Sequence, residues 1–403
     1  NQHSSCPICR QECIIISPEV TYPDIEFPQG ILQIYRRLSS PDIQEQEIKH
    51  YKTQIHKIIH SVLNSGNYIL GKEVKKLENK FQNYLKCKKA IGVKNGTDAL
   101  ILSLKAIKIK KGDEVITTAH TAVATIAAII DVGAVPVIAD VEQDFYTVNP
   151  KEIEKKISKK TKAIVPVHIY GQCCNMSEII KIAKKNKIFV IEDCSQSLGS
   201  TIGNKKVGTF GDIGTFSFYP TKNLGAIGDG GMIVTNNNNL GKKLYRLREY
   251  GWDKNRSTLE PGINSRLDEI QAGILNIKIN DLDNANKKRI KISKYYSEKI
   301  SNKLVKLPQV RKNTRHVFHI FSLLVNKRDK FIKYLKKNKI NPGIHYLRPA
   351  CLNKGYKEKC IFSKNDIKKT IFISNNTVSL PIYPELQKKK VMKIVEVINK
   401  FRS

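Results

Sequence analysis

One lysine of this chain lies between two apolar runs, in the stretch FSFYPTKNLGAIGDGGMIV, residues 216–234. Lys222 follows a strand-like segment that carries Ser217, and a glycine cluster and a second strand-like segment come after it. Most lysines lie exposed on turns. A lysine removed from water loses its charge readily, however, and its neutral amine can form a Schiff base with a carbonyl compound. The apolar flanks and the GDGG bend favour this second interpretation.

Two further segments place polar residues after predicted strands. The segment NGTDAL opens a predicted helix, and the backbone N–H groups of Gly96 and Thr97 and the threonine hydroxyl are suited to an anion. An ordinary N-cap by Thr97 or Asp98 explains the same residues. The segment HTAVAT begins with His120, whose ring could lie against a flat cofactor or simply occupy a loop.

The segment VIEDCSQS carries acidic residues directly at the end of an apolar strand. Glu192 and Asp193 are followed three residues later by Gln196. A buried carboxylate is costly unless it meets a positive partner, and a protonated ring nitrogen of a cofactor would be one. The alternative is that Asp193 caps the next helix. In an open parallel sheet all these segments would meet at the carboxyl ends of the strands.

The ordered set of segments is more specific than any one of them. It combines a candidate phosphate cradle, a carboxylate for a ring nitrogen and a lysine suited to a Schiff base. These are the requirements of a pyridoxal phosphate site.

Alternating apolar and amphipathic segments predict the elements that position these residues. Strands alternating with helices indicate βαβ units and a mainly parallel sheet, and near-continuous apolar strands such as AIVPV fit a sheet covered on both faces. The fold class is therefore α/β. The predicted helices are 51–63, 72–85, 95–106, 123–131 and 177–185, and the predicted strands are 114–118, 135–139, 163–168 and 189–192.

The composition changes after about residue 281, which suggests a second domain. A basic helix over 285–302, a strand over 316–325 and a helix over 329–337 predict a smaller C-terminal α+β domain. We predict a large domain over 41–283 and a small domain over 284–403.

The first 40 residues differ from the rest. The segment SSCPICRQEC places Cys6, Cys9 and Cys13 close together, which is half of a zinc site, and His3 could add a ligand. CPICR resembles the final ligand pair of a RING finger, whose other ligands are missing here. We favour a poorly ordered extension over residues 1–40 and predict no metal site.

The formal net charge of +34 is extreme. Nucleic-acid or anionic-membrane binding is one interpretation. The lysines are spread along the chain and are not interleaved with aromatic residues, which favours compositional drift or a small polyanionic substrate. We therefore predict neither a nucleic acid nor a membrane as partner.

The apolar stretch 121–141 contains Asp131, Gly133 and Pro136 and is typical of a helix followed by a strand. Nine cysteines do not make a disulfide scaffold in a chain this long, so we expect a cytoplasmic protein.

Residues from about 41 to 403 resemble the DegT/StrS-type sugar aminotransferases, which have the fold type I of pyridoxal phosphate-dependent transferases, as in aspartate aminotransferase. The resemblance rests on the segments SGNYILGKEV, NGTDAL, PVHIYGQ, VIEDCSQS, FSFYPTKNLGAIGDGGMIV, REYGW, GINSRLDEIQAGIL and SLPIYPEL.

The resemblance implies roles for the central residues of the site. Lys222 would form the Schiff base with pyridoxal phosphate and then act as general acid and base. Asp193 would pair with the pyridine nitrogen, and Gln196 would lie beside the ring near its phenolic oxygen.

The resemblance also implies how the phosphate is held. Ser217 and the backbone of Gly96 and Thr97 would bind it, and Asn264 would reach the phosphate of a neighbouring subunit, so the chain would be a homodimer. Many members place an aromatic residue against the cofactor where Ala122 lies here. Because His120 lies two residues earlier in an extended segment, we expect His120 to take over this stacking role.

The implied reaction is a ping-pong transamination. Glutamate would give its amino group to the cofactor, and a 3- or 4-keto-6-deoxy sugar linked to a nucleotide, dTDP by preference, would receive it. Relatives that act as sugar dehydratases have histidine in place of the lysine, and a scaffold or adaptor protein without activity is a further alternative. Candidate sugar contacts are His168, Tyr170, His316, His319 and Tyr346.

Overall fold

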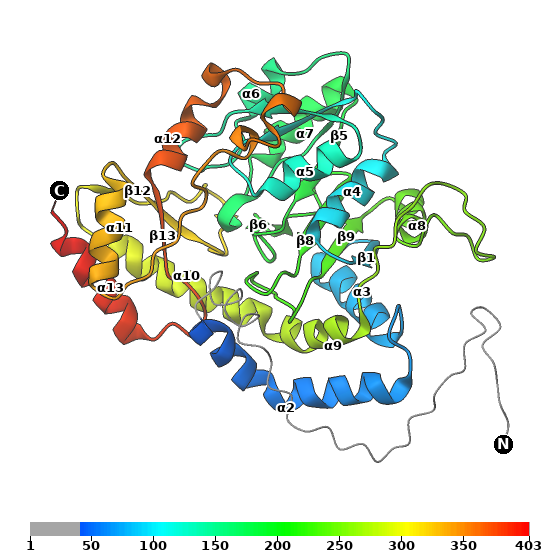
Figure 1. Cartoon of the computed structure of the whole chain (residues 1–403), viewed down its shortest axis with the longest axis horizontal. Helices are drawn as coiled ribbons and strands as arrows, with labels where there is room; N and C mark the ends of the chain where they lie inside the picture. Colours follow the sequence, from blue (N-terminus) through cyan, green and yellow to red (C-terminus); the bar gives the residue numbers. More distant parts are fainter. Residues whose placement is uncertain (1–40, 403) are drawn as a thin grey trace. The chain divides into compact units, whose positions relative to one another are not determined.

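A computed structural model of the chain describes residues 41–402. The predictions for residues 1–40, including the cysteine knuckle, lie outside the described residues. Of these, residues 43–402 belong to one compact body (Figure 1).

A seven-stranded sheet forms the centre of this body, in the order β1-β9-β8-β5-β4-β2-β3. β9 is antiparallel to both of its neighbours, and every other pair is parallel, so the sheet is mainly parallel as predicted. The strands are β1 (Lys89–Val93), β2 (Glu114–Thr118), β3 (Val135–Ala139), β4 (Thr161–Ile164), β5 (Phe189–Asp193), β8 (Ile213–Ser217) and β9 (Gly231–Thr235).

Helices cover both faces of the sheet, which explains why its strands are apolar at consecutive positions. Successive side chains of a strand point to opposite faces. In β9, Val234 accordingly packs with α3 and α9, whereas Ile233 packs with α4 and α8. The helices of the large sheet are α3 (Lys72–Leu85), α4 (Gly96–Ala106), α5 (Val123–Asp131), α6 (Pro150–Lys155), α7 (Met176–Asn186), α8 (Asn238–Leu247) and α9 (Glu269–Lys278).

Two helices far apart in sequence are tied together at the edge of this core. The long helix α2 (Pro41–Ser65) precedes α3, whose N-terminus receives no side-chain cap from its own N-cap residue Gly71. Glu269 of α9 takes that place, since its carboxylate accepts the N–H groups of Glu73 and Val74, both at 2.9 Å. This capping from a distance satisfies donors that a helix start leaves free.

The C-terminal part builds a second, antiparallel sheet in the order β10-β12-β13. Its strands are β10 (Val305–Lys306), β12 (Phe321–Val325) and β13 (Thr377–Leu380), and α10 (Leu282–Lys299), α11 (Arg328–Lys337) and α13 (Lys388–Lys400) accompany it around a core of their own. A third small sheet joins β6 (Thr201–Ile202), β7 (Lys205–Lys206) and β11 (Thr314–Arg315).

A segment between α11 and β13 returns to the large sheet. Ala350 donates its N–H to the carbonyl of Ala119, and Ile361 forms a parallel bridge with Val137 of β3. Asp140, just beyond β3, accepts the N–H groups of Lys369 and Thr370 at the start of α12 (Lys368–Asn376). The division at residues 283 and 284 therefore stays a prediction, because α10 crosses it and this segment packs against the larger sheet.

Two predicted strands are shorter than expected. The strand predicted over 163–168 ends at Ile164, and Val167 then makes only an isolated bridge to Asp193. The strand predicted over 316–325 begins at Phe321, because Phe318 has a positive φ of 46° that interrupts extended backbone. Within residues 41–402, no helix combines the length and apolar character needed to cross a membrane.

Candidate active site

The predicted site residues gather at one edge of the large sheet. Gly96 follows β1, His120 follows β2, Asp193 ends β5 and Ser217 ends β8. Lys222 lies in the connection from β8 to β9. Since β1, β2, β5 and β8 run in the same direction, their carboxyl ends meet at this edge, which is where open α/β sheets bind ligands.

The start of α4 forms the predicted anion cradle, with one correction. The helix begins at Gly96 itself, and its N-cap is Asn95, whose side chain accepts the N–H of Asp98 at 2.7 Å, so neither Thr97 nor Asp98 is the cap. A helix start leaves its first N–H groups without intrahelical partners, here those of Gly96 and Thr97. The positive end of the helix then favours an anion.

Ser217 lies directly against this helix start. A Cβ atom added to Gly96 would come within 2.7 Å of Ser217 Cβ, closer than side-chain carbons approach each other. Only glycine permits this approach of β8 to α4. The half-buried Ser217 hydroxyl is thereby placed beside the free N–H groups.

The loop that carries Lys222 is fixed at its base. Phe218 accepts a backbone hydrogen bond from Ala226 and donates one to Gly230, both at 2.8 Å, and Lys222 donates its own N–H to the carbonyl of Tyr219. A Cβ atom on Gly225 would lie 2.3 Å from the Pro220 carbonyl oxygen. The glycines after Lys222 therefore serve to fold a tight loop between two buried strands.

Lys222 is only partly accessible and is surrounded by protein. Burial lowers the pKa of its amine to about 8, from an ordinary value of 10.5, and the negative charge of Asp193 partly opposes this shift. A lysine with this pKa supplies neutral amine near neutral pH, as Schiff-base chemistry requires. Within residues 41–402, the Lys222 Nζ atom has no hydrogen-bond partner.

The two acidic residues at the end of β5 have different environments. Asp193 accepts hydrogen bonds from the Thr125 hydroxyl at 2.9 Å and from the N–H of Ser195 at 3.1 Å. Glu192 is completely buried and accepts three backbone N–H groups, from Gly208, Phe210 and Gly211, at 2.7–2.8 Å. Of these two acidic residues, it is Asp193 whose charge acts on the pKa of Lys222.

Glu192 belongs to a buried group that superficially resembles a metal site. His168, Glu192 and Cys194 place potential ligand atoms within 4.8 Å of one another. However, His168 donates from Nε2 to Glu192 at 3.0 Å and accepts the N–H of Cys174 at Nδ1, so both ring nitrogens are already used. This group stabilises the turn before β8. The same contacts give His168, a predicted sugar contact, a scaffold role.

Gln196 links the sheet edge to the C-terminal part. Its Oε1 accepts the N–H of Tyr170 at 2.7 Å, and its Nε2 donates to the Tyr346 hydroxyl at 2.8 Å. Tyr170 is fully buried and has a positive φ of 62°, an unusual backbone conformation for a bulky residue. Such conformations persist where the surroundings hold them and often occur at functional sites.

His120 is buried in this same aromatic group. Its Nε2 lies 2.8 Å from the Tyr170 hydroxyl, whose proton goes to the carbonyl of His345. A phenol has one proton to give, so His120 donates from Nε2 and keeps Nδ1 as an acceptor. That Nδ1 is buried and has no partner among the described residues. A buried acceptor left alone is costly, which indicates that a ligand or water completes it.

Asn264 is exposed and forms an isolated antiparallel bridge with Glu249. An exposed side chain is compatible with the predicted contact to another subunit. That contact remains a prediction.

Sequence reasoning missed two neighbours of Lys222. His345 is half-buried, and its Nδ1 forms a hydrogen bond of 2.9 Å with the Ser379 hydroxyl. Burial, and to a smaller extent the charge of Lys222, lower the pKa of His345 to about 4. Asn223 contacts His319 Nδ1 at 3.0 Å. The sequence signal for His345 is only its place in a loop, HYLRP, far from every predicted strand end.

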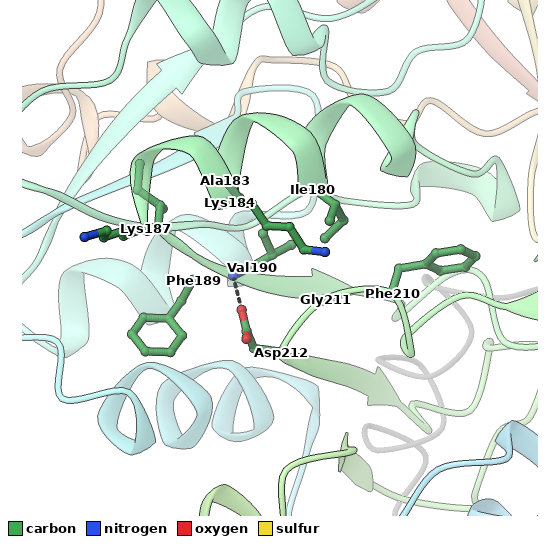
Figure 2. A pocket seen from close by; sticks show the side chains of 10 residues that line it. Ile180, Ala183, Lys184, Lys187, Phe189, Val190, Phe210, Gly211 and Asp212 are labelled. Atoms are coloured by element: carbon green, nitrogen blue, oxygen red, sulfur yellow. Dashed lines mark hydrogen bonds between the residues drawn. The ribbon is translucent and has the colours of Figure 1, made fainter.

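A separate cleft of about 300 Å³ lies away from these residues (Figure 2). It is at the amino end of β5, where Phe189 and Val190 begin the strand, whereas Asp193 is at the carboxyl end. Figure 2 shows α7 along one side of it, with Lys184 and Lys187 labelled. The cleft is therefore not part of the candidate active site.

The residues of the sheet edge fit pyridoxal phosphate. The helix start with Ser217 suits a phosphate, Asp193 suits a protonated ring nitrogen and Lys222 suits the aldehyde. The unpartnered His120 Nδ1 shows that the surrounding protein does not by itself complete the site.

Comparison with known proteins identifies the same chemistry. The DegT/DnrJ/EryC1/StrS aminotransferase family matches residues 49–399. This chain belongs to that family. The chain is 44% identical to the dTDP-3-amino-3,6-dideoxy-α-D-galactopyranose transaminase of Aneurinibacillus thermoaerophilus, over 87% of this chain and 96% of the relative.

Solved structures agree with this assignment. The structure of DesV of S. venezuelae is similar with a TM-score of 0.86 and 32% identity, covering 89% of this chain and 96% of DesV. The structure of ntda of Bacillus subtilis with bound cofactor PMP is similar with a TM-score of 0.80 and 28% identity, covering 87% and 81% of the two chains. The aminotransferase family member described here is thus a transaminase with pyridoxal phosphate as cofactor, and the predicted fold class is confirmed.

Proposed function

We propose that this aminotransferase transfers an amino group from glutamate to a dTDP-linked 3-keto-6-deoxy sugar. The observation that carries the proposal is the position of Lys222. The Lys222 amine has a pKa near 8 and interacts with the charge of Asp193. Its loop is fixed and follows β8, which carries Ser217 of the anion cradle. This combination supplies a reactive amine next to a phosphate site.

Pyridoxal phosphate, when bound, supplies an aldehyde that accepts the amino group and a ring that takes up electrons from the substrate carbon. Lys222 would hold this aldehyde, and its amine would serve as the acid and base that moves a proton at the donor carbon. Its pKa near 8 leaves both protonation states accessible near neutral pH, as an acid and base requires.

The neighbouring residues hold the cofactor in place. Asp193 is fixed by Thr125 and Ser195, and its negative charge would keep the ring nitrogen protonated. Gln196 is held in a defined orientation by Tyr170 and Tyr346, and it would lie beside the ring. Ser217 and the start of α4 hold the phosphate.

His120 is proposed to lie against the cofactor ring. In many relatives an aromatic residue at the position of Ala122, two residues further along the chain, has this role. Burial and the nearby His345 lower the pKa of His120 to about 3, so it stays uncharged. An uncharged ring fits a position against a flat aromatic cofactor.

The choice of carbon and nucleotide rests on the Aneurinibacillus relative. By its name, this relative makes a dTDP-linked 6-deoxy sugar that carries an amino group at carbon 3. The similarity to this chain extends over 96% of the relative. The net charge of +34 would favour encounter with a nucleoside diphosphate. Glutamate as donor follows from the family resemblance.

The active unit is proposed to be a homodimer in the cytoplasm. Exposed Asn264 would contact the cofactor phosphate held by the other subunit. Neither nucleic acid nor membrane is part of the proposal. No observation favours a scaffold protein, and the presence of Lys222 favours transamination over dehydration.

The direct test supplies matched substrates. The purified protein with pyridoxal phosphate and glutamate is incubated with the dTDP-linked 3-keto-6-deoxy sugar or its 4-keto isomer, and the products are identified by mass spectrometry and NMR. The proposal predicts a 3-amino sugar and little product from the isomer. Amination of the 4-keto isomer alone would move the assignment to carbon 4, and amination of neither would refute the proposed substrate.

A further inference from the structure

Two side chains of α9 hold the loop that carries Lys222. Gln271 Oε1 accepts the backbone N–H of Ile227 at 3.0 Å. Lys278 Nζ donates to the backbone carbonyl of Gly225 at 2.5 Å. Residues 271 and 278 are seven positions apart, which is about two helical turns, so both lie on the same face of α9. This face of the helix therefore lies along the loop.

The helix that supplies these contacts is itself tied to α3. Glu269 caps the start of α3, and Asn276 Nδ2 donates to both the backbone carbonyl and the carboxylate of Glu73, each at 2.9 Å. Lys80 of α3 donates to the carbonyl of Asn276 at 2.7 Å. Since α9 is held at several points along its length, it forms a fixed support for the loop.

The next helix, α10, holds the loop at a third point. Asn286 is fully buried, and its Nδ2 donates to the carbonyl of Leu198 at 3.1 Å. Its Oδ1 accepts a hydrogen bond of 2.7 Å from Asn223 Nδ2, and Asn223 is the residue directly after Lys222. Three alternate residues of the loop, 223, 225 and 227, are thus bonded to the two helices.

Lys278 is the charged member of this group. It is only 8% exposed, and a buried ammonium group is costly unless acceptors use its protons. A hydrogen bond from a charged donor is also stronger than one between neutral groups. Its acceptor, Gly225, packs so closely on Pro220 that a Cβ atom would lie 2.3 Å from the Pro220 carbonyl oxygen. Because Pro220 and Gly225 lie on either side of Lys222, the bond fixes the loop on both sides of that residue.

We propose that Lys278 is a positioning residue for Lys222, because its hydrogen bond to Gly225 sets the place of the loop from which the Lys222 amine acts. The inference rests on the proposed function, in which Lys222 is the reacting amine. That amine must serve two steps from one backbone position, and a displacement of about 1 Å can slow a reaction by roughly a hundredfold. Lys278 acts through the backbone of the loop and need not touch cofactor or substrate.

Two matched substitutions separate support of the loop from support of α9. Lys278→Met removes the donor to Gly225 and keeps a long, unbranched side chain. Lys80→Met is the control, since Lys80 also donates to a backbone carbonyl, that of Asn276, but joins α9 to α3 and not to the loop.

Hydrogen exchange of the cofactor-free proteins measures the loop directly. The N–H groups of Ala226 and Ile227 are bonded to the Phe218 carbonyl and to Gln271, so their exchange reports opening of the loop. Mass spectrometry of peptides from residues 218–230 should show exchange roughly tenfold faster in Lys278→Met, because a charge-assisted bond is lost. Exchange in Lys80→Met should equal that of the unchanged protein.

The reaction of Lys222 gives a second measurement. Stopped-flow absorbance measures the rate of Schiff-base formation with pyridoxal phosphate. Equilibrium titration measures the affinity for pyridoxamine phosphate, which carries an amine in place of the aldehyde and forms no bond to Lys222. We expect Lys278→Met to slow Schiff-base formation by roughly tenfold and to leave the affinity for pyridoxamine phosphate unchanged, because the loop moves and the phosphate site does not.

An unchanged rate and unchanged exchange in Lys278→Met would refute the proposal. So would a loss of affinity for pyridoxamine phosphate as large as the loss of rate, since Lys278 would then support the whole site and not the loop. Circular dichroism shows whether Lys278→Met is folded, and Lys278→Gln, which is too short to reach Gly225, replaces it if it is not. If the unchanged protein forms no Schiff base with pyridoxal phosphate, the proposed function fails, and the exchange rates alone decide whether Lys278 holds the loop.

Discussion

Gly96 and Ser217 approach so closely that a Cβ atom on residue 96 would lie 2.7 Å from Ser217 Cβ. This approach joins the start of α4 to the end of β8 and places a hydroxyl beside two free N–H groups. Because it depends on one missing methyl group, the phosphate site can be tested by adding that group.

Gly96→Ala is expected to weaken binding of pyridoxal phosphate by roughly tenfold, or ~1.4 kcal/mol, because Ser217 must move away from the helix start. Gly355→Ala is the matched control, since a Cβ atom there would meet nothing within 4 Å. Equilibrium titration of the cofactor-free proteins measures the effect. Unchanged affinity in Gly96→Ala would show that the phosphate is held elsewhere.

The pKa of Lys222 predicts the pH dependence of Schiff-base formation. The neutral amine is the nucleophile, so the rate in the cofactor-free protein should rise with pH and level off above about 8. Asp193 raises this pKa, so Asp193→Asn should move the half-maximal rate to lower pH. Stopped-flow absorbance provides the profile, and a rate that still rises near pH 10.5, the ordinary value, would contradict the account.

The same shift predicts the effect of pH on folding. Between about 8 and 10.5 the unfolded lysine still binds a proton that the folded one has lost. Its contribution to the free energy of unfolding therefore increases with pH across this window and is constant outside it. Comparing urea unfolding of the cofactor-free protein with that of Lys222→Met over this range isolates the contribution.

Glu192 should be important for stability and not for chemistry. Glu192→Ala leaves three backbone N–H groups and His168 without their acceptor, and we expect a loss of about 3–5 kcal/mol in the free energy of unfolding. Glu298→Gln, at an exposed pair with Lys294, should change it by less than about 0.5 kcal/mol. Urea unfolding measures both. A small loss in Glu192→Ala would mean that the turn has other supports.

Asn264 offers a test of the shared active site. Lys222→Ala and Asn264→Ala chains should each be inactive or nearly so, whereas unfolding and refolding them together creates mixed dimers with one unaltered site. Random mixing should restore about a quarter of the activity of the unchanged protein. Activity that stays at the level of the separate variants would place Asn264 in its own subunit's site or outside any site.

The sheet edge was predictable because its residues follow apolar strands in a regular order. Lys222, Asp193 and Gly96 each come at the end of, or soon after, a strand, and parallel topology then brings them together. The near-continuous apolar run AIVPV also predicted a sheet covered on both faces, whereas the end of β4 and the start of β12, which follows Phe318 with its positive φ, were missed.

Contacts between residues far apart in sequence were not predictable. Nothing local marks His345 or Asn286, since their places near Lys222 depend on how α10 and the C-terminal loop return to the large sheet. Glu192 and Asp193 are adjacent and equally acidic, and only the turn at Gly208–Gly211 decides which one is enclosed in backbone N–H groups. The roles of His168 and His120 likewise depend on partners in other segments.

The most direct test of the central claim is the visible absorption spectrum of the protein and of Lys222→Ala, both supplied with pyridoxal phosphate, before and after addition of glutamate. The account predicts that the unchanged protein shows the absorption band of a protein-bound Schiff base, which glutamate removes, and that Lys222→Ala shows no such band before glutamate is added. A band of equal strength in Lys222→Ala, or none in the unchanged protein, would contradict the assignment of Lys222 as the reacting amine.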